Sequence, residues 1–492
     1  MHALKILLFV CVVVAPLAGL AVLGEVPSYG QSPHPAYPSV NAVLHAEQGA
    51  LDALGAALLH RSPATTRAIG FKNWLAYDVV GFIDDRNVVS GRGDWLFYHP
   101  ELEPCFDRRR ASRSAAQIDA MTQVAGAAGL RMVVSMSPDK ATIYPEQMHP
   151  LTERYWHCKA STSKALREAL RQEAPELIDH TPTILAAKER SPQQQLYFHK
   201  DTHWTRYAGV LALRDTLAAV LHRSVAELPP PGTTAVMDEH TPDLSAAMLL
   251  LPGSERVAHV DGRIEATLPK VSASQKTVLL RDSFYGVVID DLRRLFTGVK
   301  QFSSATAGMR QPLLTAKLLV VNFVERNFIA RTAKAGPFSW TSHMGRGIAR
   351  RNAAEATKVC GDYVDVRADG QVLKTKAITT TPEGFRVVGN DPHVVVPLPA
   401  ARAPGERPCV RLALSAKTQT VEIEIFLPTG RSEDNSFALG RTFQTFVDPK
   451  TSSLAIILPT TMAGHSIRID PGPDRLRSAT ISLIEVGAAS TL

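Results

Sequence analysis

The middle of the chain carries short apolar runs that alternate with segments of helical pattern. Three runs carry apolar residues on consecutive positions: RMVVSM (131–136), KTVLLRD (276–282) and KLLVVNF (317–323). Consecutive apolar residues are typical of strands buried on both faces of a parallel sheet. Residues 112–130 and 161–176 follow a helical period, and a brief strand is predicted at 177–179. We therefore predict one α/β domain over about residues 60–345.

The last third of the chain has a different pattern, in which short β-type runs are separated by turn residues. TVEIEIF (420–426) alternates apolar and polar positions, as a half-buried antiparallel strand should. HVVVPLPA (393–400) and SLAIILPT (453–460) are further runs of this kind. We predict a β-sandwich over residues 355–492. Its aromatic residues include no tryptophan, so a carbohydrate-binding module and a plain structural sandwich both remain open.

The N-terminus reads as an export signal. Lys5 precedes an apolar run from Ile6 to Leu23, and small residues stand near the end of that run. We assign residues 1–24 to a signal peptide, with an uncleaved anchor as the alternative, because the run lies at the lower edge of the length that spans a bilayer. Residues 25–59 begin with a Pro/Ser-rich stretch and are predicted to be a tether and N-terminal segment.

The cysteines agree with export. Cys11 belongs to the signal, which leaves four cysteines in the exported part. Each predicted domain holds two of them, which favours pairing Cys105 with Cys158 and Cys360 with Cys409, although four cysteines allow three pairings. Closing the first loop would stabilise the fold by roughly 4 kcal/mol on the chain-entropy model. Such pairs require an oxidising compartment, which here would be the periplasm or the cell exterior.

Composition adds little to the choice of partner. The formal charge of +7 on 492 residues, with a pI near 9.1, is only a weak bias toward an acidic polymer. No stretch interleaves basic and aromatic residues as a nucleic-acid surface does, so no nucleic-acid partner is expected. No cofactor motif was found, and no cofactor is expected.

Two separated segments carry the candidate chemistry. VLLRDSFYG (278–286) places Ser283 after a strand and at the start of a helix, so that its hydroxyl is exposed at the carboxyl edge of the sheet. There the backbone N–H groups of Ser283 and its neighbour are expected to face a developing oxyanion. A serine needs a base, and DTHWT (201–205) offers His203, with Asp201 close enough to fix its tautomer.

Blander interpretations compete with this triad. A single DxH or DSF is common by chance, and each is more often a cap, a turn or a satisfied polar contact. His199 and His203 are four residues apart and could bind a metal on a helix. The glutamate of an HExxH motif is missing, however, and the segment looks extended, so no metal is predicted.

Taken together, these segments resemble the AlgX/AlgJ family of alginate O-acetyltransferases. Four stretches carry the resemblance in matching order: GRGDWLFYHPE (91–101), MVVSMSPDKATIYPEQM (132–148), DTHWT (201–205) and RDSF (281–284). VVNFVERNF (320–328) resembles the strand and Glu-Arg stretch that closes the family domain. The resemblance implies an SGNH-hydrolase-like, flavodoxin-like three-layer fold in which the Asp/His block precedes the serine block. This order is permuted relative to ordinary SGNH hydrolases. By resemblance, Ser283 is the nucleophile, His203 the base and Asp201 its orienting acid.

The resemblance also implies the reaction and the partners. It implies an O-acetyltransferase that passes an acetyl group to an exported polysaccharide such as alginate, beside a membrane-bound O-acyltransferase that supplies the acetyl. An acetyl esterase with the same triad and a non-catalytic polysaccharide scaffold are the alternatives. Four residues in or beside the motifs are candidates for substrate contact, although packing is as good an interpretation for each: Lys140, Tyr144, Tyr285 and Arg326.

Overall fold

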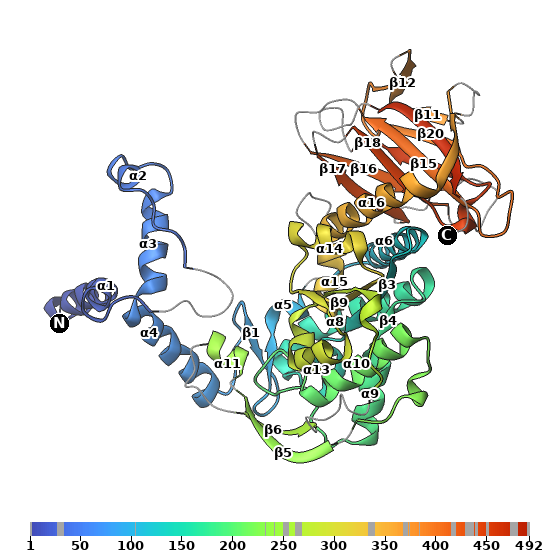
Figure 1. Ribbon diagram of the computed structural model, residues 1–492. Helices are drawn as coiled ribbons and strands as arrows, with labels where there is room; N and C mark the ends of the chain where they lie inside the picture. Colours follow the sequence, from blue (N-terminus) through green and yellow to red (C-terminus); the bar gives the residue numbers. More distant parts are fainter. Residues whose placement is uncertain are drawn as a thin grey trace.

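The computed structural model shows an N-terminal helical arm, an α/β part and an all-β part (Figure 1). The residues that the structure describes are 2–26, 34–103, 105–231, 233–240, 242–248, 255–260, 268–332, 340–367, 372, 374–382, 384–414, 420–428, 437, 441–448, 452–472 and 481–489.

The α/β part is built on one parallel sheet of five strands. Their order across the sheet is β4 (Ile178–Asp179), β3 (Arg131–Ser137), β9 (Leu318–Val324), β7 (Thr277–Leu280) and β8 (Lys300–Phe302). Every neighbouring pair is parallel. The three apolar runs form β3, β7 and β9, so their prediction is confirmed. The inner strands are buried on both faces, which is why their sequences do not alternate.

The strand order explains the permuted motif order. If counting starts at β7 and continues through β8, β9, β3 and β4, the spatial order reads 2-1-3-4-5, which is the flavodoxin-like order. The predicted fold class with permuted motifs is therefore confirmed. The strand order reverses between β7 and β9, and ligands of open α/β sheets bind outside the carboxyl ends of the strands at such a point.

Helices cover both faces of this sheet. Met132, Val134 and Met136 of β3 pack on one side, while Val133 packs on the other. The first side is covered by α6 (Arg108–Ala127), α8 (Glu153–Glu173), α14 (Arg310–Thr315), α15 (Glu325–Thr332) and α16 (Trp340–Val359). The second side is covered by α9 (Thr181–Arg190), α10 (Arg206–Leu221) and α13 (Ile289–Leu295). The helices predicted at 112–130 and 161–176 are α6 and α8, which both begin earlier.

The C-terminal part consists of two antiparallel sheets packed face to face, which confirms the predicted sandwich. One sheet has the order β12 (Ile378–Thr381), β13 (Gly384–Val387), β20 (Ile481–Ala489), β15 (Arg407–Leu414) and β18 (Ser453–Ile457), and β10 (Cys360–Asp365) also pairs with β20. The other has the order β11 (Lys374–Lys376), β14 (His393–Pro397), β19 (Ser466–Asp470), β16 (Val421–Phe426) and β17 (Thr442–Val447). In β16, Val421, Ile423 and Ile425 point into the core, as the alternation predicts.

Both predicted disulfides are present. Cys105 and Cys158 join the segment before α6 to α8, with a Cα–Cα distance of 5.3 Å. Cys360 and Cys409 join β10 to β15 inside the sandwich, with a Cα–Cα distance of 6.2 Å. Each bridge therefore lies within one of the two parts of the chain.

Helix α16 connects the two parts and packs against both (Figure 1). It contacts α14 of the α/β part and strands β17 and β18 of the sandwich, and one continuous apolar cluster includes residues from all of them. The predicted domain limits at residues 345 and 355 both fall inside this helix.

Helix α16 approaches the sandwich closely at Gly345. A Cβ added at Gly345 would lie 2.1 Å from the backbone oxygen of Gln444, so the helix would have to move away from β17. We expect Gly345→Ala to lower the free energy of unfolding by about 1–3 kcal/mol, although alanine is the better helix former. Gly126→Ala in α6 is the matched control, because nothing lies within 4 Å of its added Cβ.

Denaturant unfolding of the two variants would measure the difference. Gly126→Ala should leave the free energy of unfolding unchanged or raise it. Equal midpoints for both variants would contradict the close packing of α16 on β17.

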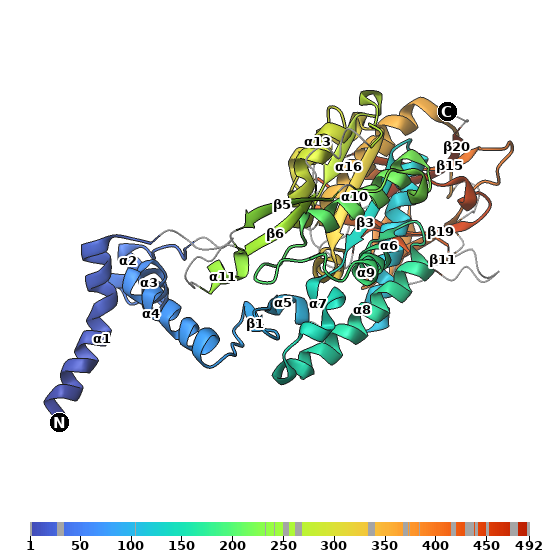
Figure 2. The same cartoon turned by 90° about the horizontal axis from the view of Figure 1, so that it is seen from below.

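The N-terminal arm extends away from the rest of the molecule in both views (Figures 1 and 2). It consists of α1 (His2–Leu23), α2 (Val40–Leu44), α3 (Ala50–Arg61) and α4 (Pro63–Trp74). No helix among the described residues is long and apolar enough to span a membrane. Residues 27–33 of the predicted tether lie outside the described residues, and the limit predicted near residue 60 falls inside α3.

Candidate active site

Ser283 stands where the sheet reverses its strand order. Strand β7 ends at Leu280, and a short 3-10 helix, Ser283–Val288, begins three residues later and continues into α13. We call residues 281–288 the serine turn. The serine is partly exposed, at the carboxyl edge of the sheet. Its placement at the start of a helical segment agrees with the pattern in the sequence.

Asp282 fastens the serine turn to the neighbouring strand. One carboxylate oxygen accepts the N–H of Ser283 at 2.8 Å, and the other accepts the N–H of Val324 at 3.3 Å and an Asn327 side-chain N–H at 3.2 Å. Arg331 pairs with the same oxygen at 3.1 Å. Burial alone would raise the pKa of Asp282, but Arg331 and these hydrogen bonds outweigh it and lower the pKa. The carboxylate is therefore held ionised.

This arrangement corrects one expectation. The backbone N–H of Ser283 was predicted to face a developing oxyanion, whereas in this conformation it donates to Asp282. An N–H that donates to a carboxylate is already satisfied, so it can serve an oxyanion only after the serine turn changes its conformation.

Asp201 and His203 lie on a loop that we call the histidine loop, residues 197–205, closed by an isolated bridge between Tyr197 and Trp204. Nδ1 of His203 lies 2.7 Å from Oδ1 of Asp201, which also accepts the backbone N–H of His203 at 2.8 Å. A carboxylate only accepts hydrogen bonds, so Nδ1 carries the proton and Nε2 is left as the acceptor. The pair is thus arranged as a base and the acid that orients it.

Trp204, which follows His203, and Phe284, which follows Ser283, join the histidine loop to the serine turn. Trp204 donates its indole N–H to the carbonyl oxygen of Phe284 at 2.6 Å. The ring of His203 packs on the ring of Phe284, with centroids 5.3 Å apart. Among the described residues, the structure records no hydrogen bond between the Ser283 hydroxyl and His203. Hydrogen bonds of this kind are often long without substrate and tighten when it binds.

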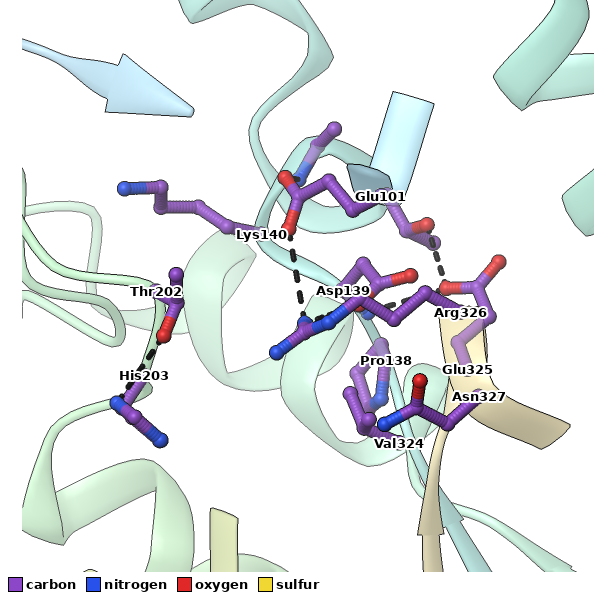
Figure 3. Close-up of polar contacts among 12 residues, drawn as sticks. Glu101, Pro138, Asp139, Lys140, Thr202, His203, Val324, Glu325, Arg326 and Asn327 are labelled. Atoms are coloured by element: carbon purple, nitrogen blue, oxygen red, sulfur yellow. Dashed lines mark hydrogen bonds and ion pairs between the residues drawn. The ribbon is translucent and has the colours of Figure 1, made fainter. Parts of the chain in front are cut away.

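Lys140 holds the backbone of the histidine loop through hydrogen bonds from its ammonium group. Its side chain is fully buried, and its ammonium donates to the carbonyl oxygens of Phe198, His199 and Asp201 at 3.2, 3.0 and 2.7 Å. In Figure 3 it points toward the loop that carries Thr202 and His203. Burial lowers the pKa of Lys140 to about 8. Because all three donors are used on the backbone, we assign Lys140 to positioning the loop, not to substrate contact.

A buried ionic cluster lies beside Lys140, where β3 and β9 end (Figure 3). Arg326 pairs with Asp139 at 2.7 Å and with Glu101 at 3.7 Å, and Lys159 pairs with Asp139 at 2.7 Å and with Glu325 at 3.2 Å. Arg326 is therefore neutralised inside the protein, and its geometry favours the ion-pair alternative over substrate contact.

The pKa values of the two glutamates in the cluster are shifted in opposite directions. Burial would raise the pKa of Glu325, but Lys159 and hydrogen bonds from Ser163 and Thr142 outweigh it and lower the pKa to about 2. Burial together with the nearby Asp139 raises the pKa of Glu101 to about 7. The cluster therefore holds Glu325 as a firm anion at the carboxyl end of β9.

The two tyrosine candidates are also interior. Tyr285 has no exposed surface, and its hydroxyl contacts Thr216 at 2.6 Å, His180 at 3.1 Å and Ser135 at 3.3 Å. Burial raises its pKa to about 12. The hydroxyl of Tyr144 accepts the N–H of Leu196 at 3.3 Å. Both tyrosines thus anchor the segments around the site, which favours the packing alternative for each.

One carboxylate at the site has no signal in the sequence. Asp243 comes from α11 (Asp243–Ala247), and its Oδ2 lies 3.6 Å from Nδ1 of His203. Asp201, His203 and Asp243 offer ligand atoms within 4.8 Å of one another, which is close enough to share a cation. The lone pair of Nδ1 is not available for a metal, however, because that nitrogen carries the proton that Asp201 accepts. His199 bonds Asp94 at 3.1 Å instead of joining His203.

The site belongs to a segment that resembles known acetyltransferases. Residues 88–283 match the family model described as SGNH hydrolase-like domain, acetyltransferase AlgX. The probable alginate O-acetylase AlgJ of Pseudomonas fluorescens is 23% identical over 190 residues, covering 38% of this chain and 47% of the relative. That of Pseudomonas syringae pv. tomato is 24% identical over 213 residues, covering 43% and 51%. The chain spans about half the length of these curated relatives.

Two solved structures are similar to this chain at low sequence identity. The O-acetyltransferase domain of Pseudomonas putida AlgJ is 17% identical and covers 51% of this chain and 96% of that chain, with a TM-score of 0.36. Pseudomonas aeruginosa AlgX is 13% identical and covers 82% and 94%, with a TM-score of 0.38. The resemblance to the AlgX/AlgJ family that four sequence stretches predicted is confirmed by the family match and the curated relatives.

Proposed function

We propose that this protein is an O-acetyltransferase that moves an acetyl group through an acetyl-Ser283 intermediate to hydroxyls of an exported polysaccharide. The observation that carries the proposal is the 2.7 Å hydrogen bond from Nδ1 of His203 to Oδ1 of Asp201, beside the serine turn. This bond leaves Nε2 free to act as a base. The match of residues 88–283 to an acetyltransferase family supports the choice of reaction.

The proposed reaction has two matching halves. In the first, Nε2 of His203 takes the Ser283 proton as Oγ attacks the acetyl carbonyl, and the imidazolium then gives that proton to the leaving group. In the second, a sugar hydroxyl gives its proton to Nε2 and attacks the acetyl-serine, and the serine oxygen leaves with that proton. Asp201 keeps Nδ1 protonated and stabilises the imidazolium in both halves.

The acceptor and donor follow from the resemblance and the composition. The curated relatives are named as probable alginate O-acetylases, and the formal charge of +7 agrees with an anionic polymer such as alginate. We propose a membrane-bound O-acyltransferase as the source of the acetyl group. We assign residues 60–345 to the catalytic domain and residues 355–492 to a sandwich whose candidate role is carbohydrate binding.

Export to the periplasm is part of the proposal. The apolar run of residues 6–23 supports an export signal or an anchor. The two disulfides support an oxidising compartment, because such bonds persist outside the cytosol.

The test is to follow a labelled acetyl group. Purified protein is given a labelled acetate ester together with oligomannuronate, a neutral glucan oligomer or an amino-sugar oligomer, and free acetate and acetylated sugar are separated by mass spectrometry. We expect label to move from acetate to the uronate oligomer, because a positioned hydroxyl outcompetes water. Constant acetate release across the panel, with no labelled sugar, would show an esterase instead.

A further inference from the structure

An inserted hairpin between α10 and β7 packs against the histidine loop. It consists of β5 (Thr233–His240), α11 and β6 (Glu255–Val260), and the described part of it supplies two carboxylates to the loop. Glu255 accepts the backbone N–H groups of His199 at 2.5 Å and of Lys200 at 3.1 Å. Leu244 donates its N–H to the carbonyl oxygen of Lys200 at 3.2 Å. The insertion therefore fixes the backbone just before Asp201.

Asp243 reaches farther and contacts both members of the Asp–His pair. Its backbone N–H donates to Oδ2 of Asp201 at 2.8 Å. Its carboxylate accepts the N–H of Thr202 at 2.8 Å and the hydroxyl of Thr202 at 2.7 Å. The same carboxylate lies 3.6 Å from Nδ1 of His203. One residue of α11 thus orients the acid and places a second negative charge next to the base.

We propose that Asp243 is a positioning residue, a second carboxylate that stabilises the imidazolium of His203 and holds the side chain of Asp201 in place during acetyl transfer. This inference rests on the proposed function. The Nδ1–H of His203 is shared between Asp201 at 2.7 Å and Oγ1 of Thr202 at 3.1 Å, and the Thr202 hydroxyl donates its own proton to Asp243. Asp243 therefore acts through its charge and through Thr202. Asp201 and Asp243 lie 2.7 and 3.6 Å from Nδ1, and the ammonium of Lys140 donates to the carbonyl oxygen of Asp201 at 2.7 Å.

The surroundings of Asp243 agree with this role. Burial and the neighbouring Asp201 raise its pKa, while His203 and the two bonds from Thr202 favour the ionised form. Its side chain is 42% exposed, so solvent reaches this carboxylate. Asp201, by contrast, is 1% exposed. Nδ1 of His203 thus has one buried and one partly exposed carboxylate beside it.

The test compares Asp243→Asn with Asp290→Asn. Asparagine at 243 keeps an oxygen for the Thr202 N–H but removes the charge. Asp290 is the matched control, because it is 65% exposed on α13 and pairs with the surface residue Arg293 at 3.0 Å. Hydrolysis of a chromogenic acetate ester is measured from acid to neutral pH for both variants and the unaltered protein, together with thermal midpoints.

We expect Asp243→Asn to lower kcat by about 10- to 100-fold with KM changed less than about twofold, because a misplaced base costs that much. The acidic limb of its kcat/KM profile should move to lower pH, because the imidazolium loses a neighbouring negative charge. A purely structural role would not move that limb. A kcat within about twofold of the control, or a limb that does not move, overturns the inference.

Asp243→Glu separates loss of charge from loss of folding. If the thermal midpoint of Asp243→Asn falls, the glutamate variant should restore more than half of the lost activity, because it keeps the charge; no restoration overturns the inference. Failure of the proposed function is recognised separately, since Ser283→Ala would then stay active. If Ser283→Ala is inactive and Asp243→Asn keeps its activity, the inference about Asp243 is rejected and the proposed function is retained.

Discussion

Replacing Ser283 by alanine is expected to lower kcat for a chromogenic acetate ester by about 10⁴-fold or more, and to abolish acetyl transfer to sugar. The alanine lacks the oxygen that forms the covalent intermediate, and triad residues that act as a unit lose most of the rate when any one is removed. The fold should be retained, because Asp282 fastens the serine turn and the Ser283 hydroxyl does not. Peptide mass spectrometry should find an acetyl group on the peptide that contains position 283 in the unaltered protein, and none on the same peptide of Ser283→Ala.

Two comparisons make this result decisive. Ser304→Ala, an exposed serine beyond β8, should be fully active. The double variant Ser283→Ala/His203→Ala should be no slower than Ser283→Ala, because the base has no role without its nucleophile. Activity of Ser283→Ala above about a tenth of normal would remove this serine from the mechanism.

The sheet was predictable because its signals are local. Runs such as KLLVVNF have apolar residues on consecutive positions, and only a strand covered on both faces buries all of them. The contact of His203 with Asp201 was also predictable, since the two residues are close enough in sequence to meet on any bent loop. The pairing of the cysteines followed from the domain division, and the two bridges confirm it.

The supporting charges were not predictable because their partners are distant in sequence. Lys140 and Arg326 stand in family motifs and suggested substrate contact. The carbonyl oxygens that Lys140 binds are about 60 positions away, and Asp139 is 187 positions from Arg326. No pattern in the chain shows that these charges are neutralised in the interior. The role of Asp243 was not predictable for the same reason, because Asp201 and Thr202 are 42 and 41 positions away from it in the sequence.

Asp201→Asn is the second large effect that we expect, with kcat lowered by about 10³- to 10⁴-fold and the fold retained. Asp201 accepts three N–H groups, two from His203 and one from Asp243. An amide has one oxygen and one NH₂, so one side must place donor against donor. With the NH₂ toward His203, Nδ1 becomes the acceptor and Nε2 carries the proton, and this tautomer cannot take the proton of Ser283.

The opposite rotation of the amide does not rescue the site. It returns the oxygen to His203 but turns the NH₂ toward the backbone N–H of Asp243, which would push α11 away from the loop. The Asp243 carboxylate, 3.6 Å from Nδ1, favours the tautomer with Nδ1 protonated in a fraction of the molecules, so Asp201→Asn should retain more activity than His203→Ala, which has no base at all. Ester hydrolysis and thermal midpoints of the two variants, measured beside Asp290→Asn, give this order directly. Asp201→Asn as active as Asp290→Asn would mean that the histidine tautomer is not set by Asp201.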